Sequence, residues 1–119
     1  MSIAAASAVL GGSLVGLGAS GAGAAETAGA CDYIMVVKNN SNGYGYFKGP
    51  TPLRKLPEAR CGSHGTYRDN TKFYFWCYTT NRHGNNWIFG RIAGTEETGW
   101  VYEKNISWND GRLKHCRES

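Results

Sequence analysis

The sequence of 119 residues has no stretch in which apolar residues recur at helical spacing, and it contains no internal repeat. These absences argue against a helical bundle and against a solenoid or propeller, because each of those folds depends on such a pattern. Histidine is scarce: His64 and His83 lie in predicted turns, and His115 lies near the C-terminus. No histidine stands in a pattern with a nucleophile or with paired carboxylates, so we expect a protein that is not an enzyme.

Charge is absent from the N-terminal end. Residues 3–17 are small or aliphatic, and Ala22-Gly23-Ala24 follows them. The run is too short and too rich in glycine for a membrane span, and it ends in the A-x-A form of a signal peptidase site. We therefore expect residues 1–24 to be a secretory signal peptide, residues 25–32 a short lead and residues 33–116 one small extracellular domain.

All four cysteines lie in the expected mature part. In a small exported domain an even number favours two disulfides, because a small core leaves little stability to spare. Four cysteines allow three connectivities, which the sequence alone does not separate. Two alternatives carry less weight: a lipid-anchored Cys31, and a zinc site around Cys61-x-x-His64, which an oxidising compartment disfavours. We expect no metal and no other cofactor.

The formal net charge is +4 at pH 7, and the sequence pI is about 9.0. A mild positive charge favours contact with anionic polymers, but it does not choose among teichoic acids, nucleic acid and phospholipid heads. Lysine and arginine are spread from Lys38 to Arg117 without a block of like charge, which is typical of a solvated surface.

Short β-branched and aromatic runs predict an all-β fold of about five strands, a small barrel or sandwich. Between the first two strands, residues 39–52 are dense in asparagine, glycine and proline, which predicts a long irregular loop. A last short strand or 3₁₀ turn is expected at residues 105–107. The other expected strands are Asp32–Val37, Lys72–Thr79, Trp87–Ile92 and Trp100–Tyr102.

Strict alternation in the central strand separates its side chains into two faces. We expect Phe73, Phe75 and Cys77 to point inward. The other face is then an aromatic stripe, and an uncovered stripe of this kind marks a binding surface. The alternative is that residues 39–49 fold over it, with Phe47 anchoring that loop to the core. The candidate ligand-binding residues are Tyr74, Trp76, Tyr78, Tyr44 and Tyr46.

Several segments resemble the bacterial SH3-like (SH3b) domain, especially the cysteine-containing versions in small secreted proteins of actinobacteria such as Streptomyces. Residues 52–57 stand where that family has a Leu-x-x-Arg-x-Gly-Pro run, although Lys55-Leu56 replaces the small residue and the glycine. The resemblance covers roughly residues 33–107. It is carried by Gly65-Thr66-Tyr67, Thr71 to Cys77, Asn86-Trp87, Arg91 to Thr95, Gly99-Trp100-Val101 and Asn105-Ile106.

The resemblance implies a small SH3-like barrel of about five short antiparallel strands, with a long irregular first loop. Such a barrel brings the chain ends together, which implies the disulfide Cys31–Cys116 and leaves Cys61–Cys77 as the second. Trp87 and Trp100 recur in the family as packing residues near its ligand groove. The expected core is Phe73, Phe75, Trp87, Ile92, Trp100 and Val101.

The function that the resemblance implies is that of a secreted, non-enzymatic binding module. Its aromatic groove would recognise the peptide or cross-bridge part of peptidoglycan at the cell wall. The alternative is a small protein-interaction subunit, such as an adaptor, an inhibitor or a toxin component, that docks onto another secreted protein. Nucleic acid is a disfavoured partner, because export is a poor context for it, and no membrane span is expected.

Overall fold

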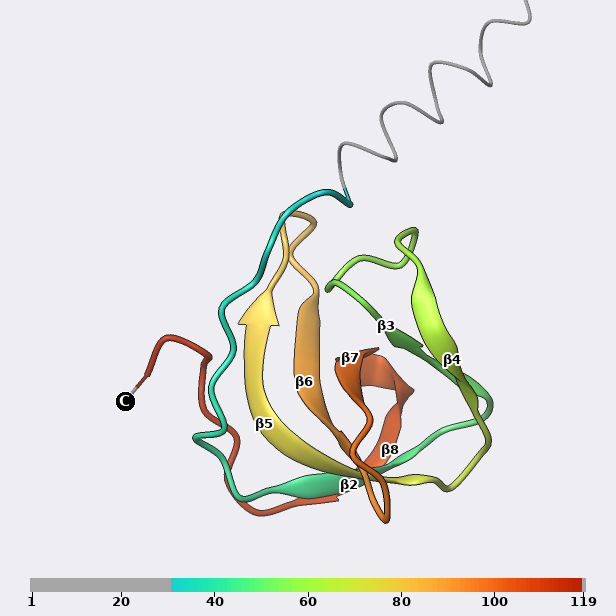
Figure 1. Ribbon diagram of the computed structural model, residues 1–119. Coiled ribbons are helices and arrows are strands. Elements are labelled where there is room, and N and C mark those ends of the chain that lie inside the picture. Colours follow the sequence, from blue (N-terminus) through green and yellow to red (C-terminus); the bar gives the residue numbers. More distant parts are fainter. Residues whose placement is uncertain (1–30, 119) are drawn as a thin grey trace, which may run out of the picture. The chain divides into compact units, whose positions relative to one another are not determined.

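The computed structural model describes residues 31–118, so the expected signal peptide (1–24) and most of the expected lead (25–32) lie outside the described residues. The described part forms an antiparallel sheet of seven strands in the order β4-β3-β7-β6-β5-β2-β8 (Figure 1). The all-β class is confirmed, with seven strands where about five were expected. The elements are β2 (Tyr44–Phe47), β3 (Thr51–Arg54), β4 (Ser63–Tyr67), β5 (Lys72–Thr80), β6 (Asn86–Ile92), β7 (Thr98–Tyr102), the 3₁₀ turn η1 (Glu103–Asn105) and β8 (Ile106–Asp110).

The N-terminal part of this sheet differs from the sequence prediction. Residues 32–37 are not a strand, although they are apolar and β-branched. The expected irregular loop over residues 39–52 contains β2 and the first half of β3. The glycine-rich sequence around β2 favours a loop, but Gly43, which directly precedes the strand, has a packing role. A Cβ on Gly43 would lie 2.8 Å from two backbone oxygens, so this position requires glycine for close packing. The turn after β2 uses Gly49 at φ +74°.

A β-bulge at Trp76 changes the alternation of β5. Phe75 lies opposite Gly90 of β6, and Cys77 lies opposite Phe89, so Trp76 is the extra residue. Phe73 and Phe75 point inward as predicted, but Cys77 joins the opposite face and Tyr78 packs against the interior. We call the interior cluster the inner core; its buried members are Phe47, Leu53, Phe73, Phe75, Ile88, Ile92, Val101 and Ile106.

A second cluster covers the other face of the central strands. Trp87 and Trp100 are buried, as predicted, with 4% and 1% of their surface exposed. They do not lie with Phe73, Phe75, Ile92 and Val101, because they point to the opposite face of the sheet. Strands β6 and β7 are therefore buried on both faces. We call this cluster the outer core: Cys77, Trp87, Trp100 and Cys116 are buried, and Met35, Val37, Phe89 and Tyr102 pack against them.

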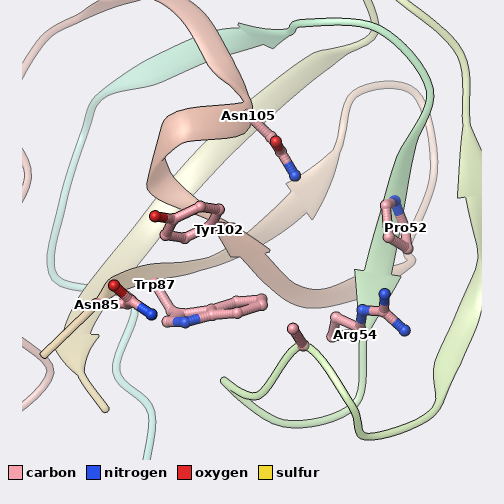
Figure 2. Close-up of a pocket in the computed structure, with 7 residues that line it drawn as sticks. Pro52, Arg54, Asn85, Trp87, Tyr102 and Asn105 are labelled. Carbon is pink, nitrogen blue, oxygen red and sulfur yellow. The ribbon is translucent and has the colours of Figure 1, made fainter. Parts of the chain in front are cut away.

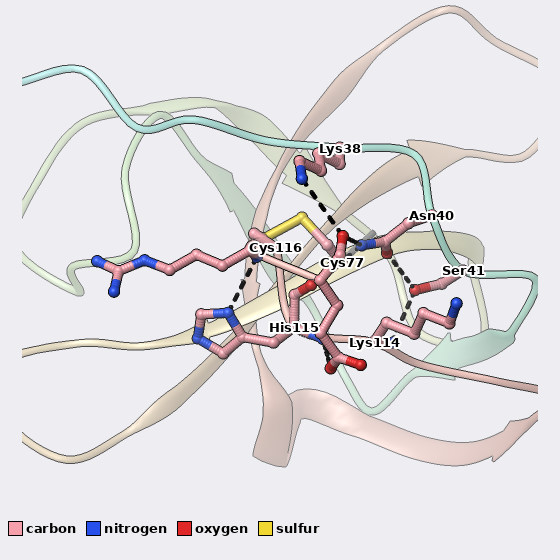
Figure 3. The surroundings of a disulfide bond; sticks show 9 residues. Lys38, Asn40, Ser41, Cys77, Lys114, His115 and Cys116 are labelled. Carbon is pink, nitrogen blue, oxygen red and sulfur yellow. Dashed lines mark hydrogen bonds between the residues drawn. A yellow bond between two sulfur atoms is a disulfide. The ribbon is translucent and has the colours of Figure 1, made fainter.

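The disulfide connectivity that the family resemblance implied, Cys31–Cys116 with Cys61–Cys77, is wrong. The bonds are Cys77–Cys116 and Cys31–Cys61. The C-terminal segment pairs with an edge of β5: Tyr78 N donates to Lys114 O at 3.0 Å, and Cys116 N donates to Tyr78 O at 2.9 Å. This pairing sets Cys116 beside Cys77, which the bulge has turned to the outer face (Figure 3).

Polar side chains of the segment before β2 fasten the C-terminal segment in place. The Asn40 side-chain amide donates to His115 O at 3.0 Å and to Glu118 O at 2.9 Å, and Lys114 N donates to Ser41 Oγ at 2.9 Å (Figure 3). Asn40 N also donates to Trp76 O at 3.1 Å. Residues 34–43 and the C-terminal segment therefore run together beside β5 (Figure 1).

Candidate functional site

A cavity of about 190 Å³ opens beside the outer core (Figure 2). We call it the groove. Four parts of the chain that are distant in sequence meet around it: strand β3, the loop of residues 55–62, the start of β6 with the turn before it, and the end of β7 with η1. The groove is lined by Pro52, Arg54, Ala59, Asn85, Trp87, Tyr102 and Asn105.

Two aromatic rings in contact, tilted relative to one another, form part of the groove wall. Trp87 and Tyr102 are register partners on β6 and β7, and their ring centroids lie 5.5 Å apart at an interplanar angle of 38°. The Trp87 indole Nε1 is buried and has no hydrogen-bond partner among the described residues. A buried polar group without a partner is rare and costs free energy, and the described part of the chain supplies no acceptor for this N–H.

A buried carboxylate connects two loops beside the groove. Only 4% of the Glu58 side chain is exposed, and its oxygens lie 3.6 Å from Arg82 Nε and 3.4 Å from His83 Nε2. The Arg82 guanidinium is a cation, whereas His83 contributes a charge only when it is protonated. Glu58 precedes Ala59 in the loop, and both cations belong to the turn that leads to Asn85. The ion pairs therefore set the distance between two walls of the groove.

Hydrogen bonds reinforce the same two loops. Asn81 Nδ2 donates to Pro57 O at 2.9 Å, which joins the turn to the loop a second time. Asn81 Oδ1 accepts from the backbone N–H of Asn85 at 3.1 Å, which shapes the turn itself. On the other wall, Arg54 Nη1 donates to Cys61 O at 3.1 Å. The groove thus exists before any ligand binds, which lowers the entropic cost of binding.

The aromatic stripe expected on β5 is divided in the folded chain. Tyr74 lies directly opposite Tyr44 of β2, whose neighbour Tyr46 lies opposite Lys72, so these tyrosines come together. Trp76 packs against Phe89, with centroids 5.3 Å apart. None of the five predicted ligand-binding residues lines the groove, and their binding role stays a prediction.

Tyr78 is covered, but by a different segment from the expected one. Its backbone pairs with residues 114–116, and its ring lies 5.1 Å from that of His115 in an edge-to-face contact. These contacts of Tyr78 come from the C-terminal segment, whereas residues 39–49 were the expected cover of the stripe. Phe47 is fully buried in the inner core, which confirms that it anchors β2.

Sequence reasoning found only part of the groove. Trp87 and the run that contains Pro52 were placed near a ligand groove by the family resemblance. Tyr102, Asn85 and Asn105 were missed. The sequence did contain a signal for Tyr102. It ends the predicted strand Trp100–Tyr102, in which alternation places it on the same face as Trp100.

One ionisable group outside the groove has a shifted pKa. The Tyr67 hydroxyl of β4 donates a hydrogen bond to the Glu97 carboxylate in the loop before β7. That bond, partial burial and the negative charge of Glu97 raise the pKa of Tyr67 above its ordinary value of 10.0. The phenol therefore keeps its proton at neutral pH and fixes this loop to β4.

Comparison with known proteins gives no relative: the chain matches no family model, no curated protein and no solved structure. Within residues 31–118, no group of three or more His, Cys, Asp or Glu side chains is placed to hold a metal ion. In the same part of the chain, no helix has the length and apolar character needed to span a membrane.

Proposed function

We propose that this chain is a non-enzymatic binding module that holds an extended peptide in the groove. The observation that carries this proposal is the Trp87 indole, which lines a preformed aromatic groove and whose buried N–H has no acceptor among residues 31–118. A peptide carbonyl oxygen supplies such an acceptor. Tyrosine and tryptophan are also the residues that most often dominate the energy of binding interfaces.

The remaining groove residues suit the same ligand. Pro52 and Ala59 offer apolar contact, while the amides of Asn85 and Asn105 can each donate to and accept from a peptide backbone. Arg54 is the cation among the lining residues, and a guanidinium is suited to binding a carboxylate. The groove chemistry therefore favours a short peptide that carries a carboxylate over an uncharged or cationic one.

The sequence resemblance supports the same class of function. In an SH3b domain the loop after the Pro52-Leu53-Arg54 position borders the ligand groove, and here the loop of residues 55–62 contributes Ala59 to the groove. On that basis the ligand we propose is the peptide or cross-bridge part of peptidoglycan, met by an extracellular protein at the cell wall. Peptides of this kind carry free carboxylates, in keeping with Arg54.

A second candidate function has its own observation. Ile34 and Val36 are 94% and 72% exposed, whereas their neighbours Met35 and Val37 pack against the outer core. Two large aliphatic side chains in adjacent outward positions favour contact with another protein. The alternative is therefore a small adaptor, inhibitor or toxin component that docks onto another secreted protein through this segment.

The variant Trp87→Phe tests the groove, because it keeps an aromatic ring and removes the N–H. Association with purified sacculi should weaken about tenfold, the value of one lost hydrogen bond at the upper end of its usual range. Trp76→Phe is the matched control, since that residue lies outside the groove, and it should bind as the wild type does. Sedimentation with sacculi measures both variants, and circular dichroism shows that each is folded.

The same assay separates the two candidate functions. Ile34→Ser/Val36→Ser should leave sedimentation with sacculi unchanged if the groove is the binding site. If that variant loses capture of a protein from culture supernatant while Trp87→Phe keeps it, the adaptor function is supported. Undiminished sedimentation of folded Trp87→Phe with sacculi would reject the groove proposal.

A further inference from the structure

Three tyrosines and two cations form a patch across β2, β5 and β6, away from the groove residues. Tyr44, Tyr74 and Arg91 lie side by side in register on the three strands, and Tyr46 lies opposite Lys72 in the next row. Directly opposed residues of an antiparallel sheet point to the same face. We call these five residues the tyrosine–cation patch: Tyr44, Tyr46, Lys72, Tyr74 and Arg91.

The rings hold the two cations in place. Lys72 Nζ lies 4.5 Å from the ring centroid of Tyr44 and 5.1 Å from that of Tyr74. Arg91 Cζ lies 5.0 Å from the ring centroid of Tyr74, and its Nη1 donates to Thr95 O at 2.8 Å. Cation–π attraction of this kind restricts side chains that are otherwise mobile. The charges are therefore positioned before a ligand arrives.

No acidic side chain of residues 31–118 forms an ion pair with either cation. Both ion pairs in the described part of the chain belong to Glu58, so Lys72 and Arg91 have no carboxylate within 4.0 Å there. Asp110 lies opposite Tyr44 on β8, and its Oδ1 accepts a hydrogen bond from Gly111 N at 2.8 Å. Two fixed positive charges without a counter-charge attract an anion.

We propose that the tyrosine–cation patch binds a linear phosphodiester polymer that carries no bases, of the poly(glycerol phosphate) type. Arginine and lysine are the usual phosphate ligands of proteins, and the two cations lie on adjacent strands where one flexible chain can reach both. Single-stranded nucleic acids gain much of their affinity by stacking bases on aromatic rings. Here cations occupy ring faces of Tyr44 and Tyr74, so the patch presents charge more than stacking surface.

The test uses poly(glycerol phosphate) as the probe and isothermal titration calorimetry as the measurement. Removing both charges with Lys72→Gln/Arg91→Gln should weaken binding at low salt about tenfold, as expected for two partly exposed contacts. Lys55→Gln/Arg117→Gln removes the same charge from exposed positions outside the patch, and it should weaken binding much less. Equal losses in the two variants would mean that net charge alone attracts the polymer, and would overturn the proposal.

The ring that holds the cations gives a second, independent readout. Tyr74→Phe keeps the cation–π contact and should bind as the wild type does, whereas Tyr74→Leu should bind more weakly. Equal binding by folded Tyr74→Leu would reject the patch as the site. An oligodeoxythymidylate that binds more tightly than poly(glycerol phosphate) would also overturn the proposal, in favour of single-stranded nucleic acid. Sedimentation of Trp87→Phe with sacculi tests the groove separately, so the two proposals fail independently.

Discussion

The inner and outer cores lie on opposite faces of the same strands and are built in different ways. Phenylalanine and aliphatic residues of the sheet itself fill the inner core. The outer core consists mainly of tryptophan, tyrosine and cystine, and segments near the two ends of the chain complete it through Met35, Val37 and Cys116. The inner core is thus closed by strand pairing, whereas the outer core depends on segments that a disulfide and side-chain hydrogen bonds hold in place.

This difference assigns different roles to the two cores. A small antiparallel sheet usually packs one face against the core and exposes its other face to water. Here that face is covered, and the groove opens where the cover ends, beside Trp87 and Tyr102. The inner core therefore maintains the fold, while the outer core supports the proposed peptide site. Substitutions that affect one core and not the other can test this division.

The largest expected effect comes from Trp100, which is compared with its neighbour on the opposite face. Trp100→Ala should lower the free energy of unfolding by about 3–5 kcal/mol, because it leaves a large cavity in the outer core. Val101→Ala removes two methyl groups from the inner core and should cost about 2 kcal/mol. Urea denaturation measures both values. A smaller loss for Trp100→Ala than for Val101→Ala would show that the outer core adds little stability.

The disulfide Cys77–Cys116 should have the next largest effect. Its 39-residue separation leads us to expect a loss of about 2–4 kcal/mol in Cys77→Ala/Cys116→Ala, chiefly through a less restricted unfolded chain. Cys31→Ala/Cys61→Ala is the matched control, because it opens a loop only slightly shorter and the entropic cost should be similar. A larger loss in the first variant would measure what the C-terminal cover adds to the outer core. Equal losses would contradict that contribution.

Much of the sheet could be predicted from local sequence. The residues of β5, β6 and β7 are mostly β-branched and aromatic, and each predicted strand agrees with the observed one at one end and is one or two residues short at the other. The burial of Trp87 and Trp100 was also predictable, because large aromatic residues fill the core of a small domain. Strand β2 was not predictable in this way, since Gly43, which directly precedes it, is required by close packing against segments that are distant in sequence.

The bulge at Trp76 accounts for most of the remaining differences. The residue types from Phe73 to Tyr78 do not predict a bulge, because the bulge is fixed by the pairing of this strand with β6. By turning Cys77 outward it decides the disulfide connectivity, which four cysteines alone leave open. The groove could be predicted only through Trp87 and the family resemblance. Its other walls meet through contacts between loops, such as that between Glu58 and Arg82, which no short motif encodes.

The smallest expected effect concerns Asn40, which fastens the C-terminal segment with its side chain alone. Asn40→Ala removes the hydrogen bonds to His115 O and Glu118 O and should lower the free energy of unfolding by about 1–2 kcal/mol. Asn39→Ala is the matched control, since Asn39 is exposed and makes no side-chain hydrogen bond within the described residues. Thermal denaturation of the two variants measures the difference, and equal stability would show that these bonds hold nothing in place.

The same substitution shows whether Asn40 acts through the cover of the outer core. In the Cys77→Ala/Cys116→Ala background the C-terminal segment has lost its covalent tether, and the side-chain bonds of Asn40 remain beside the backbone pairing with Tyr78. If side chain and disulfide fasten the same segment, their effects couple, and Asn40→Ala should cost a different free energy there than in the wild type. If the two costs simply add, Asn40 stabilises its own loop and the outer core relies on the disulfide alone. A double-mutant cycle by urea denaturation distinguishes the two cases, because distant independent sites add to within about 0.5 kcal/mol.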